Sequence, residues 1–220
     1  MTKKQGLFIT LEGIEGVGKS TCLKFISKLL TTEGIVHVVT REPGGTAFAE
    51  EIRQLLLHRH NTPQETISSE TELLLLFASR AQHISNVILP ALQKGEWVIC
   101  DRFTDASYAY QGGGRGIPKK KISILEEWLQ GNFRPHKTLL LDASVTRALS
   151  RTKHRKQQDR IEQEKEIFFH KVRKAYLHRA RSYPARFHVI NAGRSLSQVK
   201  NNIKNILDTF ISNWKDEHAG

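Results

Sequence analysis

The sequence predicts an α/β fold in which a five-stranded parallel sheet is covered by helices on both faces. Short apolar runs alternate with segments of helical periodicity, and each run is apolar throughout. Continuous apolar strands are typical of a parallel sheet that is buried on both sides. Polar clusters follow the strands, as expected where ligands gather at the carboxyl ends of such a sheet. The expected strands are residues 7–11, 35–40, 97–101, 138–142 and 187–190.

The first half of the chain is expected to contain three helices. The first covers residues 19–30, where apolar residues recur at helical spacing, and Gly34 follows its end. The second runs from the breaker-rich turn at 41–46 to about residue 58. A long helix over 72–94 would open with a capping box formed by Ser69 and Glu72 and would be kinked by Pro90 in its last turn.

The second half is expected to contain four helical segments. A short helix over 104–110 would close at the glycine-rich run 111–116, and Pro118 would occupy the first turn of a helix reaching residue 129. Residues 144–182 are helical apart from the polar run at 152–159. Ser195 would cap the last, amphipathic helix.

A phosphate-binding loop lies between the first strand and the first helix. Residues 13–20 fit the pattern G-x-x-x-x-G-K-[ST]. Glycines let the backbone wrap around phosphate oxygens, while successive N–H groups and the helix N-terminus face the anion. Lys19 is expected to reach the β- and γ-phosphates, and the Ser20 hydroxyl is expected to ligate Mg²⁺. The predicted nucleotide-binding residues are Gly13, Ile14, Glu15, Gly16, Val17, Gly18, Lys19, Ser20 and Thr21.

Composition favours one intracellular domain. A chain of 220 residues fits a single α/β domain over 1–220, and no apolar run approaches the roughly 20 residues of a membrane span. The N-terminus is not expected to be a signal peptide, because cleavage would remove the loop. Cys22 and Cys100 read as small buried hydrophobes in a reduced cytoplasm. The net charge of +12 is concentrated between Arg147 and Arg186, within folded elements.

Three further features narrow the reaction. The third strand ends in Asp101-Arg102, which offers one group to a Mg²⁺ shell and one cation to a phosphate. Gly44-Gly45-Thr46 is a second candidate backbone site for an anion, with Arg53 on the next helix. Arginines are abundant on the expected lid, about residues 150–162. A nucleoside monophosphate kinase is indicated by two anion sites, a metal and a mobile cover of arginines. The positive charge of the arginines would offset the negative charge that accumulates between two phosphates during transfer.

The sequence resembles the bacterial thymidylate kinase family over nearly its whole length. The resemblance lies in residues 13–21, 41–46, 76–83, 101–103, 109–116 and 159–162. It implies transfer of a phosphoryl group from ATP to dTMP with Mg²⁺, giving ADP and dTDP, and a cytoplasmic homodimer that binds neither membrane nor nucleic acid. The alternatives are another nucleoside monophosphate or deoxynucleoside kinase and, more remotely, a nucleotide-switched protein that binds nucleic acid, which only the net charge supports.

The resemblance also implies roles for individual residues. Phe77 would stack on thymine, Arg80 would contact its carbonyl edge, and Tyr110 would crowd a ribose 2′-hydroxyl. The implied dTMP-binding residues are Glu42, Arg53, Phe77, Arg80, Arg102, Ser107, Tyr110 and Gln111. The implied metal residues are Ser20 and Asp101, and the implied catalytic residues are Glu15, Lys19, Arg102, Arg151, Arg155 and Arg160.

Some of these assignments have structural alternatives. Core packing is the alternative for Phe77 and Tyr110, and a solvated helix face is the alternative for Arg151 and Arg155. The lid run 153–158 lacks the glycine that is often found there in the family, and Asn191-Ala192 replaces the usual Asp-Ala near the adenine site.

Overall fold

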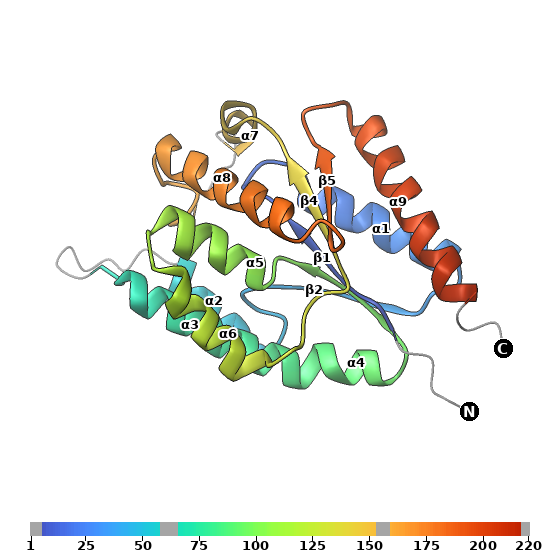
Figure 1. The fold of residues 1–220 in the computed structure, drawn as a ribbon, viewed down its shortest axis with the longest axis horizontal. Helices are drawn as coiled ribbons and strands as arrows, with labels where there is room; N and C mark the ends of the chain where they lie inside the picture. Colours follow the sequence, from blue (N-terminus) through green and yellow to red (C-terminus); the bar gives the residue numbers. More distant parts are fainter. Residues whose placement is uncertain (1–5, 58–65, 153–158, 217–220) are drawn as a thin grey trace.

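The computed structural model describes residues 6–57, 66–152 and 159–216. Its sheet has five parallel strands in the order β2-β3-β1-β4-β5 (Figure 1). The strands are β1 (Phe8–Glu12), β2 (His37–Arg41), β3 (Trp97–Asp101), β4 (Lys137–Asp142) and β5 (Phe187–Asn191). The predicted fold class is therefore confirmed, with strand bounds that shift by one or two residues.

Helices connect successive strands, as a parallel sheet requires. The first half contains α1 (Lys19–Thr32), α2 (Ala47–Leu57), α3 (Ser69–His83), the π-helical segment η1 (Ile84–Ile88) and α4 (Leu89–Gln93). The second half contains α5 (Thr104–Ser107), the π-helical segment η2 (Tyr108–Gly114), α6 (Lys119–Gln130), α7 (Val145–Thr152), α8 (Glu166–Ser182) and α9 (Leu196–Asp216).

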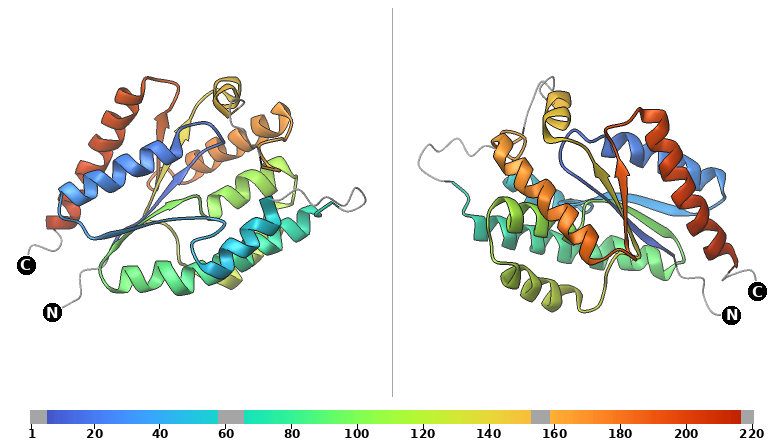
Figure 2. Two further views of the ribbon diagram at one scale, coloured as in Figure 1. Left: turned by 180° about the vertical axis from the view of Figure 1, so that it is seen from behind. Right: turned by 45° about the horizontal axis from the view of Figure 1, so that its top comes forward.

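The central strand β1 separates two apolar layers, because neighbouring residues of a strand point to opposite faces. Ile9 belongs to a buried cluster that also contains Ile26 of α1 and Ile203 of α9. Phe8 belongs to a second buried cluster with Leu92 of α4. Figures 1 and 2 show α1 and α9 on one face of the sheet and α4, α5 and α8 on the other.

One local prediction for α3 is corrected by the structure. The N-cap is Ser68, whose Oγ accepts the backbone N–H of Thr71 at 3.1 Å, so Ser69 and Glu72 form no capping box. The long helix expected over 72–94 is found as α3, η1 and α4 in succession, and Pro90 lies in the first turn of α4, directly after the π-helical segment.

The glycine-rich run after α5 also differs from expectation. Residues 112–114 do not close the helix, because it continues as η2 through Gly114. A Cβ at Gly114 would lie 2.4 Å from the ring of Phe168 on α8, so the glycine allows η2 and α8 to pack closely. Tyr110 and Gln111 are thereby placed inside η2 and not at a loose helix end.

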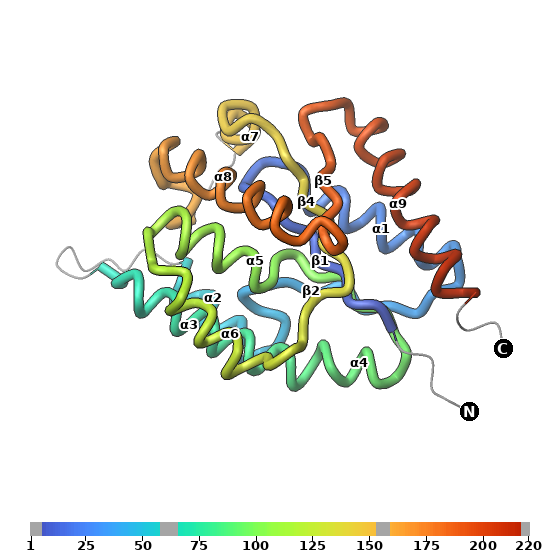
Figure 3. The backbone as a smooth tube through the Cα atoms, viewed as in Figure 1, coloured from blue at the N-terminus to red at the C-terminus, as the bar shows by residue number. Residues whose placement is uncertain are grey.

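Two further local predictions differ from the structure and three agree with it. Pro118 is the N-cap of α6 and not part of its first turn, and residues 160–165 are not helical, because α8 begins only at Glu166. Ser195 caps α9 by accepting the N–H of Gln198 at 3.3 Å. Cys22 and Cys100 are buried free thiols. Among the described helices, none has the length and apolar character needed to cross a membrane. Figure 3 traces the chain from β4 into α7 and from α8 into β5.

Candidate active site

The phosphate loop lies between β1 and α1, as predicted. Gly16 has φ = 75°, and a Cβ there would lie 2.0 Å from the carbonyl oxygen of Ala148, so a larger residue would displace α7. Lys19 is buried, and its Nζ donates to the carbonyl oxygens of Gly13 and Ile14 at 3.2 Å each. Burial and the nearby charge of Arg102 lower the pKa of Lys19. The ammonium therefore lies inside the loop, where loop carbonyl oxygens hold it.

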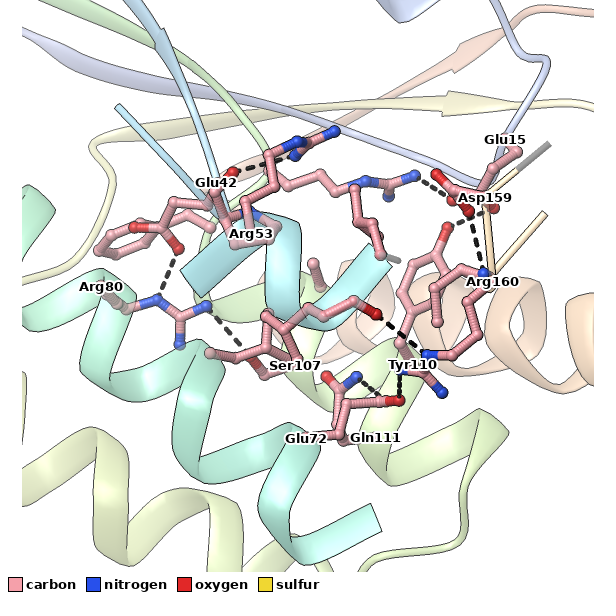
Figure 4. A pocket seen from close by; sticks show the side chains of 18 residues that line it. Glu15, Glu42, Arg53, Glu72, Arg80, Ser107, Tyr110, Gln111, Asp159 and Arg160 are labelled. Carbon is pink, nitrogen blue, oxygen red and sulfur yellow. Dashed lines mark hydrogen bonds and ion pairs between the residues drawn. The ribbon is translucent and has the colours of Figure 1, made fainter. Parts of the chain in front are cut away.

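A cavity adjoins the loop at the carboxyl end of the sheet (Figure 4). Seven of the eight residues implied to bind dTMP line it: Glu42, Arg53, Arg80, Arg102, Ser107, Tyr110 and Gln111. Glu15, Asp159 and Arg160 line it as well.

Phe77 is the implied dTMP residue that does not line this cavity. Its side chain is 5% exposed and belongs to a buried cluster with Leu73 and Tyr108. The guanidinium carbon of Arg80 lies 4.6 Å from the centre of the Phe77 ring. In this structure Phe77 therefore packs against Arg80, and Leu76 and Phe103 form the apolar part of the cavity wall. Stacking of Phe77 on thymine stays a prediction.

Arg80 projects from α3 with two of its nitrogens already paired. Its Nε donates to Glu42 at 2.7 Å and its Nη2 donates to the Ser107 hydroxyl at 3.0 Å. The third nitrogen, Nη1, is buried and has no acceptor among the described residues. Glu42 also accepts from His83 at 3.1 Å, so its carboxylate fixes Arg80 from behind. Arg80 therefore lines the cavity as a buried cation with one nitrogen unpaired.

Arg102 has a left-handed backbone conformation, with φ = 70°. Its own N–H donates to Leu11, and the next amide, of Phe103, donates to the buried carboxyl of Glu12 at 2.8 Å. These bonds stabilise a conformation that non-glycine residues rarely adopt. The predicted Asp101-Arg102 pair is therefore at the strand end, where the turn directs the Arg102 side chain toward the phosphate loop.

Glu15 joins the loop to the cavity. It accepts from Arg102 Nη2 at 2.8 Å and from the Tyr110 hydroxyl at 2.7 Å. Arg102 Nη1 also donates to the Gly13 carbonyl at 2.6 Å. Burial raises the pKa of Tyr110, so its hydroxyl stays a donor to Glu15. Glu15 occupies a variable position of the loop motif, and in the structure it lines the cavity.

The turn after β2 does not provide a second backbone anion site. The N–H of Gly44 donates to the Ser79 hydroxyl at 3.2 Å, and the N–H of Gly45 donates to the Glu50 carboxylate at 3.0 Å. That part of the prediction is wrong, because protein acceptors already occupy both amides. Arg53 does line the cavity, and its Nη1 donates to the Pro43 carbonyl at 2.9 Å.

The expected lid arginines lie in two different places. Arg151 donates to the Gly16 carbonyl of the loop at 3.4 Å. Arg160 lies across the cavity, where it donates to the Leu56 carbonyl at 3.0 Å and to the carboxylate of Glu72. Arg155 falls outside the described residues. Arg151 and Arg160 therefore flank the two ends of the site.

Glu72 is a site residue that sequence reasoning missed, because it was assigned to a helix cap. It is 2% exposed and lines the cavity. Its spacing in the sequence could have identified it as a site residue. Glu72, Leu76 and Arg80 are four residues apart and share one face of α3. A carboxylate on the same buried helix face as a substrate arginine is expected to face the site.

The phosphate loop, the adjoining cavity and the charged residues between them agree with three comparisons. A family model for thymidylate kinase matches residues 11–203. The chain is 49% identical over 208 residues to the thymidylate kinase of Nitrosospira multiformis, covering 94% of this chain and 100% of that one. It is 51% identical over 206 residues to that of Pseudomonas savastanoi pv. phaseolicola, covering 94% and 97%.

A solved structure gives the same result. The crystal structure of thymidylate kinase from Ehrlichia chaffeensis superposes with a TM-score of 0.70 at 31% identity, covering 93% of this chain and 99% of that chain. The match to the family model and the identity to full-length relatives agree with the resemblance inferred from the motifs. The chain belongs to the thymidylate kinase family.

Proposed function

We propose that the chain transfers the γ-phosphoryl group of ATP to dTMP, giving ADP and dTDP. The observation that carries this assignment is the continuous polar chain from the loop to the cavity: Gly13 to Arg102, Arg102 to Glu15, and Glu15 to Tyr110. A donor site for a triphosphate and a cavity for a monophosphate nucleotide thus share one charged wall.

The acceptor base is expected to lie beside Arg80 and Ser107. The buried Nη1 of Arg80 needs an acceptor, and the O4 carbonyl of thymine is one. Tyr110 lines the same cavity, and its hydroxyl is fixed by Glu15. Its ring is then available to fill the space that a ribose 2′-hydroxyl would need, which favours a deoxynucleotide.

In the reaction, an oxygen of the dTMP phosphate attacks the γ-phosphorus, and the bond between that phosphorus and the β–γ bridging oxygen breaks. The acceptor oxygen is already ionised at neutral pH, so the step needs no strong general base. Alignment and neutralisation of charge carry the catalysis.

The proposed catalytic cations approach from three sides. Lys19 approaches from inside the loop, and Arg102 lies between the loop and the cavity. Arg151 lies at the rim of the loop. Arg53 is proposed to bind the acceptor phosphate, and Arg160 and Arg155 are proposed to complete the cover with the lid, about residues 150–162.

The site residues fit Mg²⁺. Asp101 Oδ1 is buried and has no donor among the described residues, and Ser20 is exposed in the first turn of α1. A carboxylate and a hydroxyl are hard oxygen ligands, and Mg²⁺ binds few protein groups because it keeps waters and phosphate oxygens. Ser20 would ligate the ion and Asp101 would hold its water shell. When bound, Mg²⁺ supplies neutralisation of the phosphate charge.

Each chain is proposed to be a single domain, and two chains are proposed to form a homodimer in the cytoplasm. Phe48 on α2 and Leu74 on α3 are each 56% exposed, and these helices pack against each other, which makes their outer face a suitable interface. Leu73, in contrast, is buried within the chain. The two buried free thiols are typical of a reducing compartment.

A coupled assay of ADP release tests the activity. The purified chain is given ATP, Mg²⁺ and one of dTMP, dUMP, dCMP, AMP, GMP or unphosphorylated thymidine. We expect dTMP to have the highest kcat/KM and thymidine to give no ADP above background. A higher kcat/KM with another monophosphate, or salt-sensitive DNA binding without ADP release, would overturn the proposal.

A further inference from the structure

Glu72 accepts hydrogen bonds from three residues in two segments that are distant from it in the sequence. Gln111 of η2 donates its Nε2 at 2.7 Å, Arg115 donates Nε and Nη2 at 3.3 Å each, and Arg160 donates Nη2. Burial opposes ionisation of Glu72, but the donors from Arg160 and Gln111 and the charge of Arg115 outweigh it and lower its pKa. The side chain is therefore a buried carboxylate that can only accept.

This carboxylate decides which way the Gln111 amide points (Figure 4). An amide has one donating end and one accepting end, and rotation by half a turn exchanges them. Because Glu72 can only accept, Nε2 of Gln111 must face it. The Oε1 atom then faces away from Glu72, and no hydrogen bond to it is found among the described residues. Gln111 thus has an unpaired acceptor on a side chain that lines the cavity.

Two side chains that line the cavity, Arg80 and Gln111, have an unpaired donor and an unpaired acceptor. The donor belongs to the Arg80 guanidinium, whose Nη1 is buried and without a partner among the described residues. The acceptor is Oε1 of Gln111, on the adjacent η2. Thymine presents the complementary pair at its Watson–Crick edge, the O4 acceptor beside the N3–H donor. Cytosine presents the opposite pair, the N4 amino donor beside the N3 acceptor.

We propose that Glu72 is a specificity-determining positioning residue, which makes the site select thymine against cytosine by fixing Gln111 with its oxygen toward the base. The inference rests on the proposed function, since it concerns the same acceptor cavity. Glu72 does not contact the base in this account. It acts through Gln111, and Arg115 and Arg160 act on it by maintaining its negative charge.

The test compares dTMP with 5-methyl-dCMP, because these substrates differ only at the base edge that Gln111 would face. In the Glu72→Gln variant, residue 72 can either donate or accept, so the Gln111 amide can rotate without leaving a buried group unpaired. We expect the kcat/KM for 5-methyl-dCMP relative to dTMP to rise roughly tenfold, because the penalty of one mismatched hydrogen bond is relieved. Thermal melting checks that the variant is folded.

A structural role for Glu72 predicts a different result. Glu72→Gln also loosens Arg160 and Arg115, which would slow both substrates equally and leave their ratio unchanged. The matched control is Arg115→Gln, which removes one charge from the same cluster while leaving the Gln111–Glu72 bond. We expect this control to keep the wild-type ratio even if its kcat falls, because Arg160 and Gln111 still donate to Glu72 and keep it ionised.

A second variant keeps the inference testable if Glu72→Gln does not fold. Gln111→Ala removes the oriented acceptor and is expected to raise the same ratio. In the Gln111→Ala background, Glu72→Gln should produce no further change, because the two residues act as a unit. The inference is overturned if Gln111→Ala or a folded Glu72→Gln keeps the wild-type ratio, or if Glu72→Gln changes it without Gln111. A wild-type chain that releases no ADP with dTMP would instead refute the proposed function.

Discussion

The carboxyl group of Glu12 gives the clearest quantitative prediction for this chain. Glu12 ends β1 and has no exposed surface. It accepts from the Phe103 amide at 2.8 Å and from the Tyr176 hydroxyl at 2.7 Å. Burial, followed by the negative charge of Asp105, raises its pKa from 4.5 to about 8. Asp105 keeps its charge because Arg179 and Arg186 pair with it.

The sign of the effect on stability follows from proton binding. Between pH 4.5 and 8 the folded chain keeps a proton on Glu12 that the unfolded chain has released. The contribution of Glu12 to the free energy of unfolding is therefore fully present below pH 4.5 and is lost as the pH rises through 8. A pKa difference of about 3.5 corresponds to about 5 kcal/mol in total. The part lost between pH 6 and pH 8.5 is about 2.5 kcal/mol.

The perturbation is Glu12→Gln, which keeps the shape of the side chain but carries no charge at any pH. Urea unfolding of the ligand-free chain at several pH values gives the free energy of unfolding of each variant. We expect the wild type to lose about 2.5 kcal/mol more than Glu12→Gln between pH 6 and pH 8.5. Glu51→Gln, on the exposed surface of α2, should behave as the wild type does.

Two parallel pH profiles for wild type and Glu12→Gln would refute this reasoning, because they would mean that Glu12 has the same charge in the folded and unfolded chains. If the variant does not fold, the carbon-13 shift of the Glu12 carboxyl in labelled wild type gives its pKa directly. A midpoint near 4.5 would then contradict the prediction.

Two further variants test the assigned roles of site residues. Tyr110→Ala should raise kcat/KM for ribothymidine monophosphate relative to dTMP about tenfold, as expected when a steric and desolvation penalty of about 1.4 kcal/mol is relieved. The control Tyr110→Phe should keep the wild-type preference. Equal ratios of the two kcat/KM values in all three proteins would exclude a steric role. Asp101→Asn should raise the Mg²⁺ concentration needed for half-maximal ADP release by about 10- to 100-fold, since residues that support a metal shell have effects of this size, and an unchanged Mg²⁺ titration would show that Asp101 does not act on the metal.

The sequence alone predicts the parts of the site that a single contiguous segment forms. The loop at 13–20 contains its own glycines, its lysine and the start of α1, so a local pattern specifies both its backbone and its chemistry. The strands are likewise local, because their apolar runs show that both faces are buried. The resemblance added Arg80, Ser107, Tyr110 and Gln111, which do lie together on the cavity wall.

Predictions from local patterns were wrong where the hydrogen-bond partner of a group was not the one that the local pattern indicated. The amides of Gly44 and Gly45 looked free for an anion, but Ser79 and Glu50 reach them in the folded chain. Glu72 matched a capping box, but Ser68 caps the helix one residue earlier. In both cases the hydrogen-bonding capacity of the group was predicted correctly and its partner was predicted incorrectly.

What the sequence determined by itself was therefore the order of strands and helices, the phosphate loop and the chemical types gathered around it. Only the tertiary structure decided which charges meet: Glu15 with Arg102, Glu42 with Arg80, and Glu72 with Gln111 and Arg160. The physical reason is that a hydrogen bond is specified by positions within about 3 Å. Such positions are set by the packing of helices on a sheet, which joins residues that are tens of positions apart in the chain.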